Sequence, residues 1–221
     1  MRKLLALAVL LLAGTAHAEH VTVPVDIGIG PAAFLFVPSP VYDDQQFHFG
    51  LKLSLEAIID HATIAREKNR IPAQYRNMAM KMTEVRLTPF PLTLIPEQIF
   101  ISPKYDHTGI YGLTFKPLSI GTGLGGDPVR FSLNAGIVLT AAYLYSDLLP
   151  NTFFLRPGLS VQAELQIMPI HAFGFSLGWE SAFYVPQVLG GFDVTPIDQS
   201  IWHIGAAFFK FHFRFPYTAN L

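Results

Sequence analysis

The stretch of residues 153–168 constrains the fold more than any other part of the sequence. Its odd positions carry mainly apolar side chains, and its even positions include Arg156, Gln162 and Glu164. Because side chains alternate between the faces of a strand, this stretch has one apolar and one polar face. Its 16 residues would extend over about 50 Å, whereas a tilted strand needs only about 9–11 residues to cross a bilayer. The stretch therefore predicts a membrane-spanning strand.

The N-terminus indicates where such a strand would be found. Arg2 and Lys3 precede an apolar run at residues 4–12, and small residues at positions 16 and 18 follow. This order is typical of a secretory signal peptide, and the run is short for a retained membrane anchor, the alternative interpretation. We therefore expect a signal peptide at residues 1–18 and a single exported domain at residues 19–221.

Composition narrows the class further. Hydrophobic residues make up 51% of the chain and charged residues 14%, against a usual charged share of about 25% in soluble domains. No second run of about 18 apolar residues occurs, so the apolar residues are interleaved with polar ones. A closed transmembrane barrel requires that pattern. The absence of cysteine excludes disulfides and thiolate sites, and the net charge of −1 gives no indication of nucleic-acid binding.

Alternation along the chain predicts an all-β, up-and-down antiparallel barrel of about eight strands, with ten possible. A short extra strand at residues 98–102 and a β-bulge near Phe208 and Phe209 are also expected, the latter because the alternation changes phase there. The sequence Gly-Thr-Gly-Leu-Gly-Gly at residues 121–126 matches a dinucleotide-binding pattern, but no helix can follow it directly, so residues 121–128 predict a hairpin turn. The eight expected strands are residues 21–36, 47–56, 84–95, 107–120, 129–145, 153–168, 173–185 and 201–215.

Residues 57–82 interrupt the strand pattern. We expect two short helical pieces, at about residues 57–68 and 73–82, with Pro72 suited to a helix start. Counting strands from a periplasmic N-terminus places this insertion on the periplasmic side, where connections are normally short. It is a candidate for binding anionic headgroups or an envelope protein, and the alternative is a helical cap on the barrel mouth. The candidate interaction residues are Arg66, Lys68, Arg70, Tyr75, Arg76 and Lys81.

Charged residues also occur on the polar faces of the strands. An eight-stranded barrel has an interior just wide enough for side chains to fill, and buried charges must pair. We therefore expect a salt-bridge network that plugs the lumen; a lumenal ion path is the alternative. Glu84 also occupies a strand position that is expected to face the lumen. The predicted network is Asp26, Lys52, Glu56, Arg86, Lys116, Arg130, Arg156, Glu164, Glu180, Lys210 and Arg214.

With a signal peptide, alternating strands and aromatic residues near strand ends, the chain resembles the small outer-membrane β-barrel proteins of Gram-negative bacteria. It departs from them in that residues 216–221 follow Phe215, whereas that class usually ends on an aromatic residue. A soluble lipocalin-type barrel is the structural alternative, but the polar faces carry little charge for a surface in water. The aromatic residues are Phe47, Tyr143, Tyr145, Phe153, Trp179 and Trp202.

The resemblance implies an outer-membrane location, outer-membrane lipid as a partner, and a structural or partner-binding role in the envelope. Residues 57–82 would contact any envelope protein, and no nucleic acid is expected. Some barrels of this class modify lipid with Ser, His and an acid, but no local signature of such a triad is present. We therefore expect no catalytic residue, cofactor or metal; a lipid-modifying enzyme and a narrow pore are the alternatives.

Overall fold

A computed structural model describes residues 21–37, 46–66, 69, 72–80, 84–88, 95–105, 108–126, 128–147, 152–185 and 201–219. The expected signal peptide and the connection at 186–200 lie outside these residues. The strands are β1 (Val21–Val37), β2 (Gln46–Asp60), β3 (Glu84–Leu87), β4 (Gln98–Tyr105), β5 (Thr108–Gly126), β6 (Val129–Ser146), β7 (Thr152–Ile170), β8 (Phe173–Tyr184) and β9 (Trp202–Ala219), and the helices are α2 (His61–Arg66) and α3 (Ala73–Ala79).

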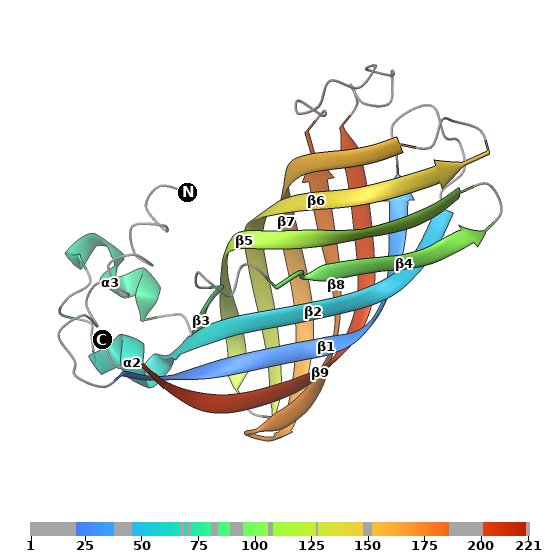
Figure 1. Cartoon of the computed structure of the whole chain (residues 1–221). Helices are drawn as coiled ribbons and strands as arrows, with labels where there is room; N and C mark the ends of the chain where they lie inside the picture. The colour runs from blue at the N-terminus through green and yellow to red at the C-terminus, as the bar shows by residue number, and fades with distance from the viewer. Residues whose placement is uncertain are drawn as a thin grey trace.

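The strands form one closed antiparallel sheet (Figure 1). Each long strand pairs with its neighbour in sequence, and β1 pairs with both β2 and β9, which closes the ring. The β1–β9 register runs from Val21 opposite Ala219 to Val37 opposite His203. No sheet edge remains along this seam, so the backbone groups of the first and last strands are satisfied within the barrel. The predicted up-and-down antiparallel barrel is confirmed.

The outer wall is apolar and the inner wall is largely polar in the half nearer the chain ends. On β7 the even positions from 156 to 168 are buried, while the odd positions from 153 to 167 are exposed or half-buried. Leu159 is 54% exposed, whereas the next residue, Ser160, is 2% exposed. The alternation predicted for residues 153–168 is therefore confirmed. Among the described residues, no helix is long and apolar enough to cross a membrane.

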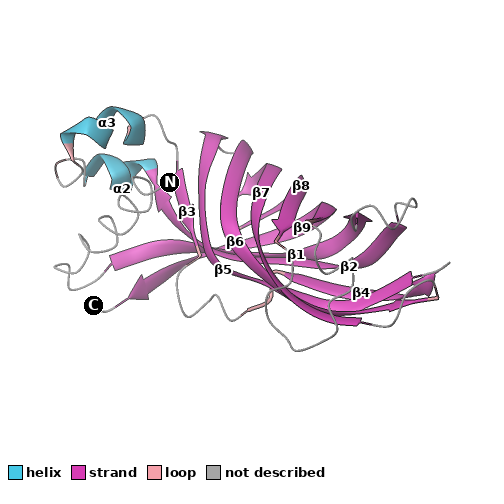
Figure 2. Ribbon diagram, turned by 90° about the horizontal axis from the view of Figure 1, so that it is seen from above, coloured by secondary structure: helices cyan, strands magenta, loops and turns pink. Residues whose placement is uncertain are grey.

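We call the end at which β1 begins and β9 ends the terminal end, and the opposite end the loop end. Both helices lie at the terminal end (Figures 1 and 2). The first helix was predicted to begin too early, because β2 continues to Asp60, and in the described part of this segment residues 61–66 and 73–79 are helical. Ile64 of α2 is fully buried. Exposed Gln74 and Asn77 lie on α3. We infer that α2 packs on the barrel and α3 faces outward.

One position in the ring is shared by two short strands. β3 pairs with the terminal-end portions of β2 and β5, and β4 pairs with their loop-end portions. The nine strands therefore fill eight positions in the ring. The predicted continuous strand at 84–95 is wrong: strand structure ends at Leu87 and resumes at Gln98. Prolines at 89, 91 and 96 explain the break, because proline cannot donate to the ladder.

The glycine-rich stretch in β5 is strand rather than turn, so the hairpin turn predicted at 121–128 is wrong over most of its length. β5 continues to Gly126, and Gly125 alone among the described glycines has a positive φ, of 94°. A Cβ on Gly121 would lie 1.4 Å from the Asn134 side chain, and one on Gly123 would lie 2.6 Å from Glu84. These glycines make room for lumenal side chains.

β9 contains no bulge. Its register with β8 is continuous from Phe173 opposite Phe213 to Tyr184 opposite Trp202, so the bulge predicted near Phe208 and Phe209 is wrong. Every even position from 202 to 214 is buried. Trp202, one of the aromatic residues expected near strand ends, therefore lies in the lumen. The alternation seemed to change phase because the inward side chains are apolar towards the loop end and charged towards the terminal end.

The loop-end half of the lumen is filled by apolar side chains rather than by the expected polar ones. Phe34 and Phe100 meet edge to face, with ring centroids 4.6 Å apart. Phe208 lies at the boundary between the two halves, with Lys210 Nζ 5.0 Å from its ring centroid. The buried cluster is Ala32, Phe34, Phe100, Ile110, Val138, Ala142, Leu144, Ala182, Tyr184, Trp202, Ile204, Ala206 and Phe208.

This packing predicts unequal effects at two adjacent positions of β9. Phe208→Ala should reduce the free energy of unfolding by about 3–5 kcal/mol, because it leaves a cavity in the filled lumen. Phe209→Ala should cost clearly less, because its ring stands on the outer wall beside Phe175 and Phe211. Urea titration in lipid vesicles, followed by tryptophan fluorescence, measures both. Equal losses, or a larger loss at Phe209, would contradict a continuous β9 register.

Candidate functional site

The terminal-end half of the lumen contains a dense set of charged side chains. The predicted network residues all point inward, and apart from Arg130 they are all at least nine-tenths buried. Among them and their partners, six carboxylates face six cations and His212. The carboxylates are Asp26, Glu56, Glu84, Glu97, Glu164 and Glu180, and the cations are Lys52, Arg86, Lys116, Arg130, Lys210 and Arg214.

Two lysines and two glutamates form a closed ring nearest the middle of the barrel. Glu97 Oε1 lies 2.9 Å from Lys52 Nζ and 2.6 Å from Lys116 Nζ. Glu180 completes the ring, with Oε1 2.8 Å from Lys116 and Oε2 paired with Lys52. Gln98 also donates to Glu180 Oε2, over 2.7 Å. The ring joins strands on opposite sides of the lumen and thereby fixes the barrel cross-section. Its two positive and two negative charges make it electrically neutral.

Arg86 is the centre of a second group, nearer the terminal end. Its Nε donates to Glu84 over 2.6 Å and its Nη1 to Glu56 over 3.0 Å. Arg130 pairs with the other oxygen of Glu84. Asn134 donates to Glu56 over 3.2 Å. A guanidinium suits this position because its donors are spread in a rigid plane and can serve several acceptors at once.

His212 is the centre of the third group. Its Nδ1 lies 2.7 Å from Asp26 Oδ1, and its Nε2 lies 2.9 Å from Glu164 Oε1. Arg214 binds the second oxygen of Asp26 over 3.0 Å, and Lys210 binds Glu164 over 3.2 Å. Glu164 is therefore bound by both Lys210 and His212.

Ser176, His212 and Asp26 have the connectivity of a Ser-His-Asp triad, since Ser176 Oγ lies 2.8 Å from His212 Nε2. Two observations argue against catalysis. Ser176 is fully buried, and a carboxylate faces each nitrogen of the imidazole. An Nε2 that donates to Glu164 cannot take the proton of Ser176 as a general base must. We therefore interpret the arrangement as structural.

Arg156 is separate from these three groups. It lies in the loop-end half, where its guanidinium stacks over the ring of Trp202 with 3.7 Å between the guanidinium carbon and the ring centroid. Its Nη1 also donates to the Val185 carbonyl over 3.4 Å. Both the aromatic face and the carbonyl favour the cation at this site. Near it, Tyr184 and Thr140 form a 2.8 Å hydrogen bond.

The predicted interaction residues are only partly described. Arg76 lies on α3 and donates to the Asn69 carbonyl over 3.1 Å. Arg66 and Tyr75 lie in α2 and α3, but their side chains are outside the described part of the chain. Lys68, Arg70 and Lys81 are outside it entirely. No group of three or more His, Cys, Asp or Glu residues arranged to hold a metal ion occurs in the described part of the chain.

Besides His212, whose inward position on β9 the predicted network left out, sequence reasoning missed Glu97. It was assigned to a loop, and its parity matches that of Ile99 and of exposed Ile101, which predicts an outward side chain. Its backbone instead bridges the neighbouring strands. Its N–H donates to the Thr114 carbonyl over 2.7 Å, and its carbonyl accepts from Leu53 over 2.8 Å. No periodic signal could have revealed this, because Glu97 lies just outside β4.

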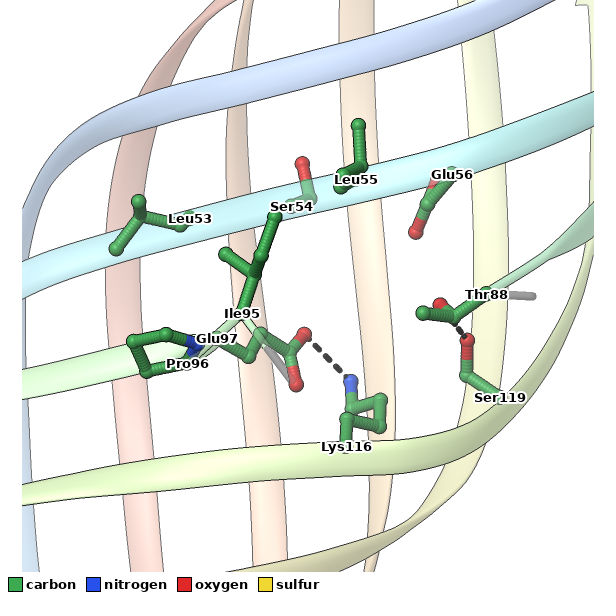
Figure 3. A pocket seen from close by; sticks show the side chains of 10 residues that line it. All are labelled: Leu53, Ser54, Leu55, Glu56, Thr88, Ile95, Pro96, Glu97, Lys116 and Ser119. Carbon is green, nitrogen blue, oxygen red and sulfur yellow. Dashed lines mark hydrogen bonds and ion pairs between the residues drawn. The ribbon is translucent and has the colours of Figure 1, made fainter. Parts of the chain in front are cut away.

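A small pocket, which we call the wall notch, occupies the space between β3 and β4 (Figure 3). On β2, residues 53–56 pair with neither short strand. On β5, residues 115–119 pair with neither. The β5–β6 register also shifts between Phe115 and Leu118, around Pro117. The notch is lined by Leu53, Ser54, Leu55, Glu56, Thr88, Ile95, Pro96, Glu97, Lys116 and Ser119.

The third group predicts energetic coupling between Glu164 and Lys210. Glu164→Gln alone should cost about 3–5 kcal/mol, because it leaves buried cations underpaired. Combined with Lys210→Met, the total loss should be smaller than the sum by about 0.5–3 kcal/mol. Glu164→Gln with Lys116→Met is the control and should be nearly additive, because Lys116 is paired with Glu97 and Glu180. Strict additivity of the Glu164–Lys210 pair in urea titrations would refute the coupling.

No protein-family model and no curated protein sequence matches the chain. The crystal structure of neisserial surface protein A matches it with a TM-score of 0.55 and 11% identity, over 86% of this chain and 97% of that one. Ail, the attachment invasion locus protein of Yersinia pestis, gives 0.45 and 12% over 87% and 99%. The N-terminal β-barrel domain of Pseudomonas aeruginosa OprF gives 0.42 and 10% over 86% and 97%. The chain thus has the fold of small eight-stranded outer-membrane β-barrels.

Proposed function

We propose that this protein is an exported outer-membrane β-barrel with a closed lumen and a structural or partner-binding role in the envelope. The observation that carries the proposal is the inverted distribution of side chains. Apolar residues such as Leu159, Val161 and Leu177 stand on the outer wall, each more than half exposed, while paired charges lie inside. An apolar exterior around a ring with a closed backbone ladder suits lipid as the surrounding medium.

The filled lumen argues against a pore. Salt bridges connect non-neighbouring strands in the terminal-end half, and aromatic and aliphatic side chains fill the loop-end half. An ion crossing this interior would have to separate buried ion pairs and then enter an apolar region, and both steps are costly. A lipid-modifying activity is supported by the Ser176–His212–Asp26 connectivity alone, and the burial of Ser176 opposes it.

The insertion between β2 and β3 is the element we assign to partner binding. With the terminal end in the periplasm, α2 and α3 project from the periplasmic mouth. Five basic and two acidic residues occur in residues 60–82, which suits anionic headgroups or an acidic envelope protein. α2 is anchored through buried Ile64, whereas α3 presents exposed Gln74 and Asn77, and Met80 directly after it is also exposed. We therefore expect α3 and its flanking basic residues to make the contact.

The closed lumen predicts no ion conduction. Purified protein in planar bilayers should show no single-channel steps in symmetrical KCl. The double variant Lys52→Ala with Lys116→Ala removes both cations of the central ring. It should show no conductance steps or fail to fold, because the loop-end cluster still fills the barrel. Regular conductance steps from the unsubstituted protein would overturn the closed-lumen proposal and favour the pore.

We expect the insertion to be required for binding envelope partners but not for folding of the barrel. Replacing residues 61–83 with a short Gly-Asn turn should preserve a barrel that migrates faster unheated than boiled on a gel, while affinity capture of envelope partners is lost. A length-matched control, Arg70→Gln with Arg76→Gln and Lys81→Gln, should weaken capture without affecting folding. Failure of the shortened chain to fold would indicate a cap. Unchanged capture by a folded shortened chain would exclude the insertion as the binding element.

A further inference from the structure

The wall notch combines a break in the barrel wall with a polar floor. The break lies near the middle of β2 and β5, where the outer wall is apolar. Leu53, Leu55, Ile95 and Pro96 are the apolar lining residues, and Ile95 is 45% exposed. Deeper lie three hydroxyl side chains, those of Ser54, Thr88 and Ser119, and three charged ones, those of Glu56, Glu97 and Lys116 (Figure 3). The notch therefore joins the outer apolar surface to the lumenal network.

One polar atom in the notch has no partner. Glu97 Oε1 is bound by both Lys52 and Lys116, but Glu97 Oε2, although buried, accepts no hydrogen bond from any described residue. Other polar side chains of the floor are engaged. Thr88 and Ser119 bind each other over 2.7 Å, and Ser54 accepts from Lys210 over 3.1 Å. A buried acceptor without a donor calls for an explanation.

The size and charge of the notch restrict what could donate to Glu97. Its free volume is about 20 Å³, enough for a group the size of a water molecule or a hydroxyl. The adjacent ring of two lysines and two glutamates is already neutral. An ammonium group would add an unbalanced positive charge beside Lys116, which burial disfavours. A neutral hydroxyl group is small enough for the notch and adds no charge beside Lys116.

We propose that the wall notch binds the hydroxyl group of a long-chain alcohol or similar neutral amphiphile, whose hydroxyl donates to Glu97 Oε2. The hydrocarbon body would lie outside, against Leu53, Leu55, Ile95 and the exposed Leu118 of β5. The interrupted ladder is what makes this possible, since an unbroken eight-stranded wall leaves no route from its outer surface to a lumenal carboxylate. The proposal rests on the membrane location proposed above.

The test compares two photoreactive probes in phospholipid vesicles, a diazirine-bearing hexadecanol and the same chain without the hydroxyl. Peptide mapping should show the alcohol labelling residues 53–55 and 95–96 at least fivefold more than the hydrocarbon. On the outer wall of β7, around Leu159 and Val161, the two probes should label equally. Absence of both probes from β7 would contradict the membrane location instead of the notch.

Variants isolate the role of Glu97. Glu97→Met should abolish the preference for the alcohol, whereas Glu84→Met, which removes a lumenal carboxylate with two cationic partners outside the notch, should retain it. Equal labelling by alcohol and hydrocarbon at the notch would overturn the proposal, as would stronger labelling by a hexadecylamine probe. Loss of the preference in both variants would do the same. If Glu97→Met does not fold, the probe ratio in the unsubstituted protein still decides.

Discussion

The structure depends on the pairing of charges in a space with little room for water. A closed eight-stranded wall leaves its inward side chains no partner except one another, and an unpaired buried charge costs several kcal/mol. Six carboxylates, six cations and His212 meet this constraint in three connected groups. Because each group contains a bridge between strands that are not neighbours in the sheet, as Glu180 on β8 joins Lys52 on β2, pairing also fixes the shape of the ring.

Much of this architecture could be predicted because alternation reports directly on which face a side chain occupies. The predicted strands at 129–145 and 153–168 agree with β6 and β7 to within about two residues, and the inward parity of Lys52, Glu164 and Lys210 follows from the same periodicity. Sequence could not show which charges pair. The partner of Glu164 depends on the register and tilt of β7 and β9, and no local pattern encodes either.

Two further features were beyond sequence reasoning for physical reasons. Phe208 and Ile204 are apolar yet face inward, because apolar side chains fill a narrow lumen as well as polar ones do. In that part of the barrel, the polarity of a side chain no longer indicates whether it faces the lumen or the outside. Glu97 reaches the lumen from a position whose parity points outward, because the strand is interrupted beside it. The prolines signalled that interruption, but not that β3 and β4 would share one place in the ring.

The central claim is that β9 keeps its even positions from 202 to 214 in the lumen, so that Phe209, Phe211 and Phe213 should face lipid. Nuclear Overhauser effects between lipid acyl chains and the rings of phenylalanine-labelled protein in nanodiscs test it without any substitution. The account predicts strong cross-peaks for Phe209, Phe211 and Phe213 and none for Phe208. Cross-peaks at Phe208, or their absence at Phe211 and Phe213, would contradict it.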